Sequence, residues 1–257
     1  LALDEAEAAI RELSLAENVV SLYRTDARLL HQLWQAAGIY QVNPLALGRK
    51  LNQPFSWKPF SEKLSTEDTV TALNIFTWLR QTGATTAASD WAEVIRPLID
   101  AQETPDSSKA AFYNTLSVLQ TNLGQEQQAD QAIDMAIDHG FGLMDPGMMA
   151  GMMANKASVL NKSGNPHHAL KLFENARLMA AIPPGNPVVE ASIIMQMAQI
   201  KSELGMANST ETEQQINHSI NIIRQLPPYD KQQKHLCELY QELASVFMER
   251  EDFSTAA

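Results

Sequence analysis

Residues 124–139 read GQEQQADQAIDMAIDH, and residues 164–179 read GNPHHALKLFENARLM. Each segment opens with a glycine and has alanines at the same two places. Three equivalent pairs therefore share one and the same offset along the chain: Gly124 and Gly164, Ala129 and Ala169, and Ala136 and Ala176. Within each segment the apolar residues recur every three or four positions, which predicts a helix with one apolar face. A helix pattern that returns at a fixed interval predicts a tandem array of structural units.

Each of these glycines also follows an apolar stripe, such as the one through residues 108–123 that precedes Gly124. Glycine is favoured where a helix ends, and two helices joined by a short turn lie antiparallel. A third unit follows with Gly205 at almost the same interval after Gly164, and we expect a longer turn over residues 206–212. A fourth unit begins near Asp230. The pattern predicts an all-α fold, a right-handed α-solenoid of antiparallel helical hairpins.

Small and large residues recur within these predicted hairpins. The small residues of the first helices are Ser117, Ala157, Ala198 and Ala244, and the large ones of the second helices are Ile133 and Phe173. With the four alanines above, this arrangement resembles the tetratricopeptide repeat (TPR) family over residues 108–257. The units here are longer than the roughly 34 residues usual in that family. The resemblance implies helices that approach closely at the small residues, with a large side chain packed between hairpins.

The chain divides by pattern at residue 64. Residues 1–64 form a predicted N-terminal helical segment with a proline-rich elbow over residues 42–60. Residues 65–257 form the predicted TPR-like domain, truncated at its C-terminal end. Its first hairpin is divergent, and we expect Ser65 to cap a helix with the stripe Val70, Leu73, Phe76 and Leu79 that closes at Gly83. Ser89 or Asp90 is expected to cap the next helix.

Composition and charge exclude several classes of function. The 257 residues carry a formal net charge of −11, which argues against nucleic-acid partners because these require clustered basic residues. No apolar run is long enough for this segment to insert into a membrane. The one cysteine, Cys237, favours a cytoplasmic location and leaves the periplasm open. No phosphate-binding glycine motif, metalloprotease motif or nucleophile elbow occurs, so the sequence predicts neither an enzyme nor a cofactor.

Methionines cluster between Met144 and Met153, five of the 11 in the chain. Packing between hairpins is the favoured interpretation, and a partner surface that includes Met148 and Met152 is the alternative. A copper site has no histidine or cysteine to support it, and the adjacent His167 and His168 point apart on a helix, so no metal is predicted. Trp57 is the better interface candidate among the tryptophans. Aspartates at 130, 134 and 138 form a predicted solvated face.

The predicted function is a scaffold that binds a protein or peptide in the groove lined by the first helices. The resemblance places at the groove Asn114, Thr121, Asn122, Ala154, Ser158, Asn161, Lys162, Met195 and Gln199. Amide side chains suit this role because they both donate to and accept from a peptide backbone.

Three alternatives stay open at this point. The first is that the segment is the helical-repeat domain, regulatory or periplasmic, of a larger membrane enzyme such as a glycan ligase, or of a signalling regulator. The second is a small-molecule pocket at the elbow near Trp57, and the third is a homodimer formed through the terminal hairpins.

Overall fold

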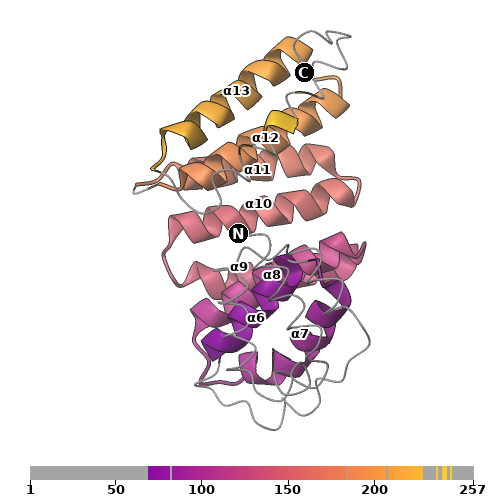
Figure 1. Cartoon of the computed structure of the whole chain (residues 1–257), viewed down its shortest axis with the longest axis vertical. Helices are drawn as coiled ribbons and strands as arrows, with labels where there is room; N and C mark the ends of the chain where they lie inside the picture. Colours follow the sequence, from indigo (N-terminus) through magenta and orange to yellow (C-terminus); the bar gives the residue numbers. More distant parts are fainter. Residues whose placement is uncertain are drawn as a thin grey trace, which may run out of the picture. The chain divides into compact units, whose positions relative to one another are not determined.

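The computed structural model describes residues 69–227 except 82, 184 and 207, together with residues 236, 239–241 and 244. This part of the chain is α-helical throughout its regular structure and falls into two compact units, divided between Leu143 and Met144. Unit 1 contains α6 (Thr69–Gln81), α7 (Thr85–Ile99), α8 (Asp106–Asn122) and α9 (Glu126–Phe141). Unit 2 contains α10 (Pro146–Lys162), α11 (Pro166–Ala180), α12 (Pro187–Glu203) and α13 (Ser209–Gln225). Figure 1 shows the helices of each unit, and the predicted all-α array of antiparallel hairpins is confirmed.

One turn geometry joins the two helices of every described hairpin. A glycine with φ between 64° and 79° follows the first helix, namely Gly83, Gly124, Gly164 and Gly205. The amide of the next residue then donates to a carbonyl five residues back, at 2.8 to 3.0 Å: Ala84 to Leu79, Gln125 to Gln120, Asn165 to Leu160, and Met206 to Lys201. This is the Schellman closure, in which a left-handed residue lets the chain satisfy the last free carbonyls of a helix. The predicted divergent first hairpin, α6 and α7, closes in the same way as the others.

The small residues that define the repeat are buried between the helices. Ser117, Ala157 and Ala198 in the first helices are completely buried. The alanines of the second helices are equally buried: Ala129, Ala136, Ala169 and Ala176. A side chain of one carbon lets two helix backbones approach closely, and every larger residue at these places would hold the helices apart.

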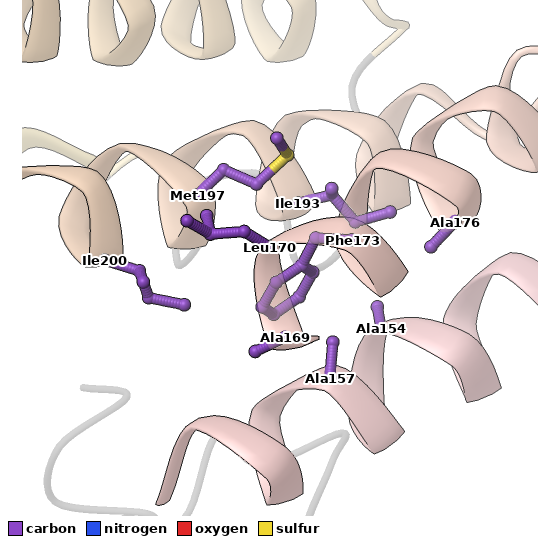
Figure 2. Packing of buried hydrophobic residues seen from close by; sticks show 9 residues of the cluster. All are labelled: Ala154, Ala157, Ala169, Leu170, Phe173, Ala176, Ile193, Met197 and Ile200. Carbon is purple, nitrogen blue, oxygen red and sulfur yellow. The ribbon is translucent and has the colours of Figure 1, made fainter. Parts of the chain in front are cut away.

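The core of unit 2 is built around Phe173, which is completely buried (Figure 2). Its ring projects from α11 among Ala154 and Ala157 of α10 and Ile193 of α12, so one side chain ties a hairpin to the next. A second cluster joins α12 and α13 through isoleucines and reaches Leu239 beyond α13. Large residues thus occupy the space that the alanines leave between helices.

The core of unit 1 is aromatic. Phe76 of α6 and Phe112 of α8 lie with ring centroids 5.4 Å apart. The indole of Trp91 is buried in α7 and donates to the backbone carbonyl of Ala72, at 3.0 Å. The bond of Trp91 ties α7 to α6 within the first hairpin, and the contact between Phe76 and Phe112 joins that hairpin to the start of the second.

Two predictions for the first hairpin were wrong. Val70 is 64% exposed, because steps of three residues drift around a helix of 3.6 residues per turn and carry Val70 away from the face of Phe76. The cap of α7 is neither Ser89 nor Asp90; α7 already begins at Thr85, directly after the glycine turn. The closure at Gly83 therefore decides where the second helix starts, and no side-chain cap is used.

Two other boundaries also differ from what the sequence pattern indicates. The apolar stripe of α9 is followed by Gly140, yet the helix continues to Phe141 with Gly140 buried inside it. The long turn expected over residues 206–212 is shorter, because Asn208 caps α13 in a reciprocal capping box with Glu211. The capping box at Asn208 explains the second of these differences.

Several predictions fall on residues outside the described part of the chain. They are the N-terminal segment 1–64 with its elbow, the boundary at residue 64, the cap at Ser65, the role of Trp57, and most of the fourth hairpin.

Substituting Phe173 with alanine is expected to lower the free energy of unfolding by about 3 to 5 kcal/mol, because it opens a cavity between three helices. Phe141→Ala is the matched control, since this ring is 78% exposed and its loss is expected to change stability by less than about 0.5 kcal/mol. Denaturant titration followed by circular dichroism measures both. A loss below about 1 kcal/mol for Phe173→Ala would contradict its place at the centre of the core.

Candidate functional site

The two first helices of unit 2, α10 and α12, each keep one face out of the core. On each helix a polar row covers about 60° of the circumference, and its members are half-buried or exposed. We call this surface the α10–α12 strip; it consists of Gly151, Asn155, Ser158 and Lys162 from α10 and Ser192, Gln196, Gln199 and Glu203 from α12. The strip is polar because it is the part of each first helix that neither its own hairpin nor the next one covers.

A hydrogen-bonded chain crosses the strip from one helix to the other. The hydroxyl of Ser158 lies 2.7 Å from Oε1 of Gln196 and 3.0 Å from the backbone carbonyl of Ala154. On its other side, the Gln196 amide donates from Nε2 to the hydroxyl of Ser192, at 3.3 Å. These bonds fix the Gln196 amide with its oxygen toward α10 and its nitrogen along α12.

The chemistry of the strip suits a peptide backbone. Hydroxyl and amide groups supply both donors and acceptors along its length. The two charged members, Lys162 and Glu203, have opposite signs and lie in the last turns of their helices. The strip therefore presents hydrogen-bonding groups of both kinds and little net charge.

The residues predicted for the groove in unit 2 divide into two groups. Ser158, Lys162 and Gln199 belong to the strip, whereas Asn161 is half-buried beside it. Two others were placed wrongly in the groove: Ala154, 7% exposed, is in the core around Phe173, and Met195 packs against the cluster between α12 and α13.

Sequence reasoning missed Gln196, the residue that links the two helices of the strip. The resemblance puts Met195 and Gln199 on the exposed face of α12, but Met195 turns toward α13 and Gln196 takes its place. The row Ser192, Gln196, Gln199 and Glu203, polar residues at spacings of three and four, is the signal that indicates the correct face.

The three predicted groove residues of unit 1 all lie on α8. Asn114 is half-buried, and its carbonyl accepts a hydrogen bond from the hydroxyl of Ser117 at 2.9 Å. The hydroxyl of Thr121 donates to the carbonyl of Ser117 at 2.7 Å, one turn back in the same helix. Asn122 is exposed at the end of α8 and lies about 80° around the helix from Asn114. Asn114 and Thr121 thus share a face, and Asn122 does not.

A cavity of about 350 Å³ lies at the other end of the strip, where α10 and α12 begin. Its lining comes from the start of α10 and from the connection between α11 and α12: Asp145, Pro146, Gly147, Met148, Ile182, Gly185 and Asn186. Asp145 caps α10 by accepting from the amide of Met148 at 3.0 Å, and Asn186 caps α12 by accepting from the amide of Val189 at 3.2 Å.

The methionines of the cluster differ in burial. Met152 is 1% exposed, so the packing interpretation describes it. Met148 is 36% exposed and forms part of the cavity wall. Met144 is 90% exposed and has a φ of 52°, a left-handed conformation that few residues other than glycine adopt. The methionines nearest the start of α10 are therefore the ones that a partner can reach.

A polar cluster at one end of unit 1 joins three helices. The hydroxyl of Tyr113 donates to Asp100 at 2.5 Å, and the ring of Tyr113 stacks on that of His139. His139 in turn lies 2.9 Å from Asp106, at the start of α8. Burial, reinforced by the bond to Asp100, raises the pKa of Tyr113 to about 12. The protonated phenol is thus favoured by folding, and its contribution to stability is present below pH 10 and is lost as the pH rises through 12.

The described helices carry neither of two other kinds of site. Within these residues, no three histidine, cysteine, aspartate or glutamate side chains come together in a group that could hold a metal ion. No described helix is long and apolar enough to cross a bilayer.

The bond between Ser158 and Gln196 makes a direct prediction for stability. A double-mutant cycle of Ser158→Ala and Gln196→Ala is expected to give a coupling energy of about 1 kcal/mol, the usual net value of one such bond. The control cycle pairs Ser158→Ala with Gln199→Ala, which share no described bond, and its coupling is expected to be near zero. Chemical denaturation of the single and double variants measures both. Coupling energies near zero in both cycles would show that the Ser158 hydroxyl donates to the carbonyl of Ala154 and not to Gln196.

Solved structures with the same fold were found by comparison with known proteins. No protein-family model matches the chain, and no curated protein matches it in sequence. Among solved structures, BtubC (BKLC) from P. vanneervenii is similar over 82% of this chain and 85% of its own, with a TM-score of 0.57 and 14% identity. The nearly identical TPR-like repeats of a kinesin light chain candidate from P. anserina are similar over 75% of this chain and 91% of theirs, with a TM-score of 0.53 and 14% identity. The chain therefore has the TPR-like repeat fold that the resemblance implies.

Proposed function

We propose that this chain is a scaffold that binds a protein or peptide along the exposed faces of its first helices. The observation that carries the proposal is the α10–α12 strip, a polar row outside the core in which Ser158, Gln196 and Ser192 hold one another by hydrogen bonds. Side chains fixed before binding lose little conformational freedom when a partner arrives, which favours recognition.

The fold supports the same role. Stacked hairpins leave first-helix faces uncovered along the array, and TPR-like repeats generally mediate protein interactions. In unit 1 the corresponding face includes Asn114 and Thr121, which share one side of α8.

Substitution within the strip tests the proposal. Gln199→Arg and Asn161→Arg place long charged side chains in or beside it, and they are expected to abolish capture of the partners that the wild-type chain retains from its native extract. The matched controls are Gln214→Arg on α13 and Asn175→Arg on α11, exposed residues of the same types on second helices. Quantitative mass spectrometry of the captured proteins gives the readout, and circular dichroism shows that the helices are intact. Equal losses in the strip variants and the controls, or no loss in either, would refute binding through first helices.

A further inference from the structure

Two opposite charges occupy equivalent places at one end of the α10–α12 strip. Lys162 lies two residues before Gly164, and Glu203 lies two residues before Gly205. Because the two glycine turns close in the same way, both residues belong to the last turn of their helix, and both are exposed. The other members of the strip are uncharged. The charge of the strip is therefore confined to this end, positive on α10 and negative on α12.

Neither charge has a partner among the residues that the structure describes. Lys162 and Glu203 form no ion pair or side-chain hydrogen bond there, whereas Glu174 and Arg177 of the neighbouring α11 pair at 2.8 Å. Glu203 also lies at the wrong end of α12 for stability, because the C-terminus of a helix favours a cation. Lys201 in the same turn does not compensate, since residues two apart on a helix do not face each other and Lys201 interacts electrostatically with Glu174.

The distance between the two helices sets the distance between the charges. The bond between Ser158 and Gln196 brings α10 and α12 into contact, and the axes of helices in contact lie about 8 to 10 Å apart. Equivalent residues on the two helices, such as Lys162 and Glu203, are separated by about the same distance. In a polyproline II peptide, residues three apart face the same side at a separation of about 9 Å. In an extended strand, residues two apart do so at about 7 Å.

We infer that the strip recognises a peptide segment with an acidic and a basic side chain two or three residues apart. The acidic side chain pairs with Lys162, and the basic one pairs with Glu203. The inference rests on the proposed function, because the backbone of the same segment bonds to the polar groups of the strip. A segment with two acidic or two basic residues would meet one like charge and be disfavoured. The charges thus select the partner, while the hydrogen bonds hold it.

Selection from a phage-displayed library of random peptides tests the inference with the full chain as target. Peptides of about 12 residues are long enough to cross both helices. Low salt is used, because exposed charges are then least screened. Relative to the unselected library, pairs of opposite charge at a spacing of two or three residues are expected to be enriched about threefold or more over pairs of like charge.

Single charge reversals provide the decisive comparison. Glu203→Lys is expected to select pairs of acidic residues at the same spacing, and Lys162→Glu is expected to select pairs of basic residues, because each variant presents two equal charges. This expectation holds for either direction of the peptide across the helices. Lys171→Glu is the matched control, since Lys171 is exposed on the second helix α11, and it is expected to keep the wild-type pattern. Circular dichroism checks that every variant keeps its helices.

The outcomes separate this inference from the proposed function. Enriched peptides that Gln199→Arg no longer retains, but that show no preference for opposite charges, would overturn the inference and leave binding through the strip intact. A charge preference that Lys162→Glu and Glu203→Lys do not change would have the same meaning. If the wild-type chain enriched no peptides beyond those of Gln199→Arg, the inference and binding through the strip would both be refuted.

Discussion

The constraint on which the rest of this structure depends is the glycine turn that reverses the chain after each first helix. A left-handed residue is required there so that the next amide reaches a carbonyl five residues back, and Gly83, Gly124, Gly164 and Gly205 meet that requirement at nearly equal intervals along the chain. Other residue types adopt this conformation only at a penalty of about 1 kcal/mol or more. The turn fixes where the second helix begins, and thereby which residues of the two helices meet.

From these turns the interior and the exterior both follow. Alanines at the helix contacts let neighbouring hairpins approach, and Phe173 fills the space between three helices of unit 2. The remaining side of each first helix has no neighbour to cover it within its hairpin, and sequence there is free to serve a partner. In unit 2 the uncovered sides carry the bond between Ser158 and Gln196, and the cavity lined by Met148 lies where these helices begin.

The parts of the fold that backbone geometry and helix contact dictate could be predicted from the sequence, because glycine and alanine leave few alternatives. Which face of each helix is buried could not be predicted as exactly, as Val70 and Gln196 show. An error of one residue turns the expected face by about 100°, which moves a side chain from surface to core or from one neighbour to another. The sequence also did not indicate which polar side chains are buried. Arg80 Nε and Gln120 Oε1 are buried without a hydrogen-bond partner, although nothing in their local sequence distinguishes them from surface residues. The cavity was not foreseeable either, because it forms between two segments that are far apart in the sequence.

The most direct measurement compares alanine at a turn glycine with alanine at a helical glycine. A Cβ atom would meet no other atom within 4 Å at Gly164, where φ is 79°, or at Gly151 inside α10, so the comparison isolates backbone conformation. The turn account predicts that Gly164→Ala lowers the free energy of unfolding by about 1 to 2 kcal/mol, while Gly151→Ala raises it by about 0.5 to 1 kcal/mol. Equal effects of the two substitutions in denaturant titrations, or stabilisation by both, would show that the hairpins do not depend on a left-handed glycine.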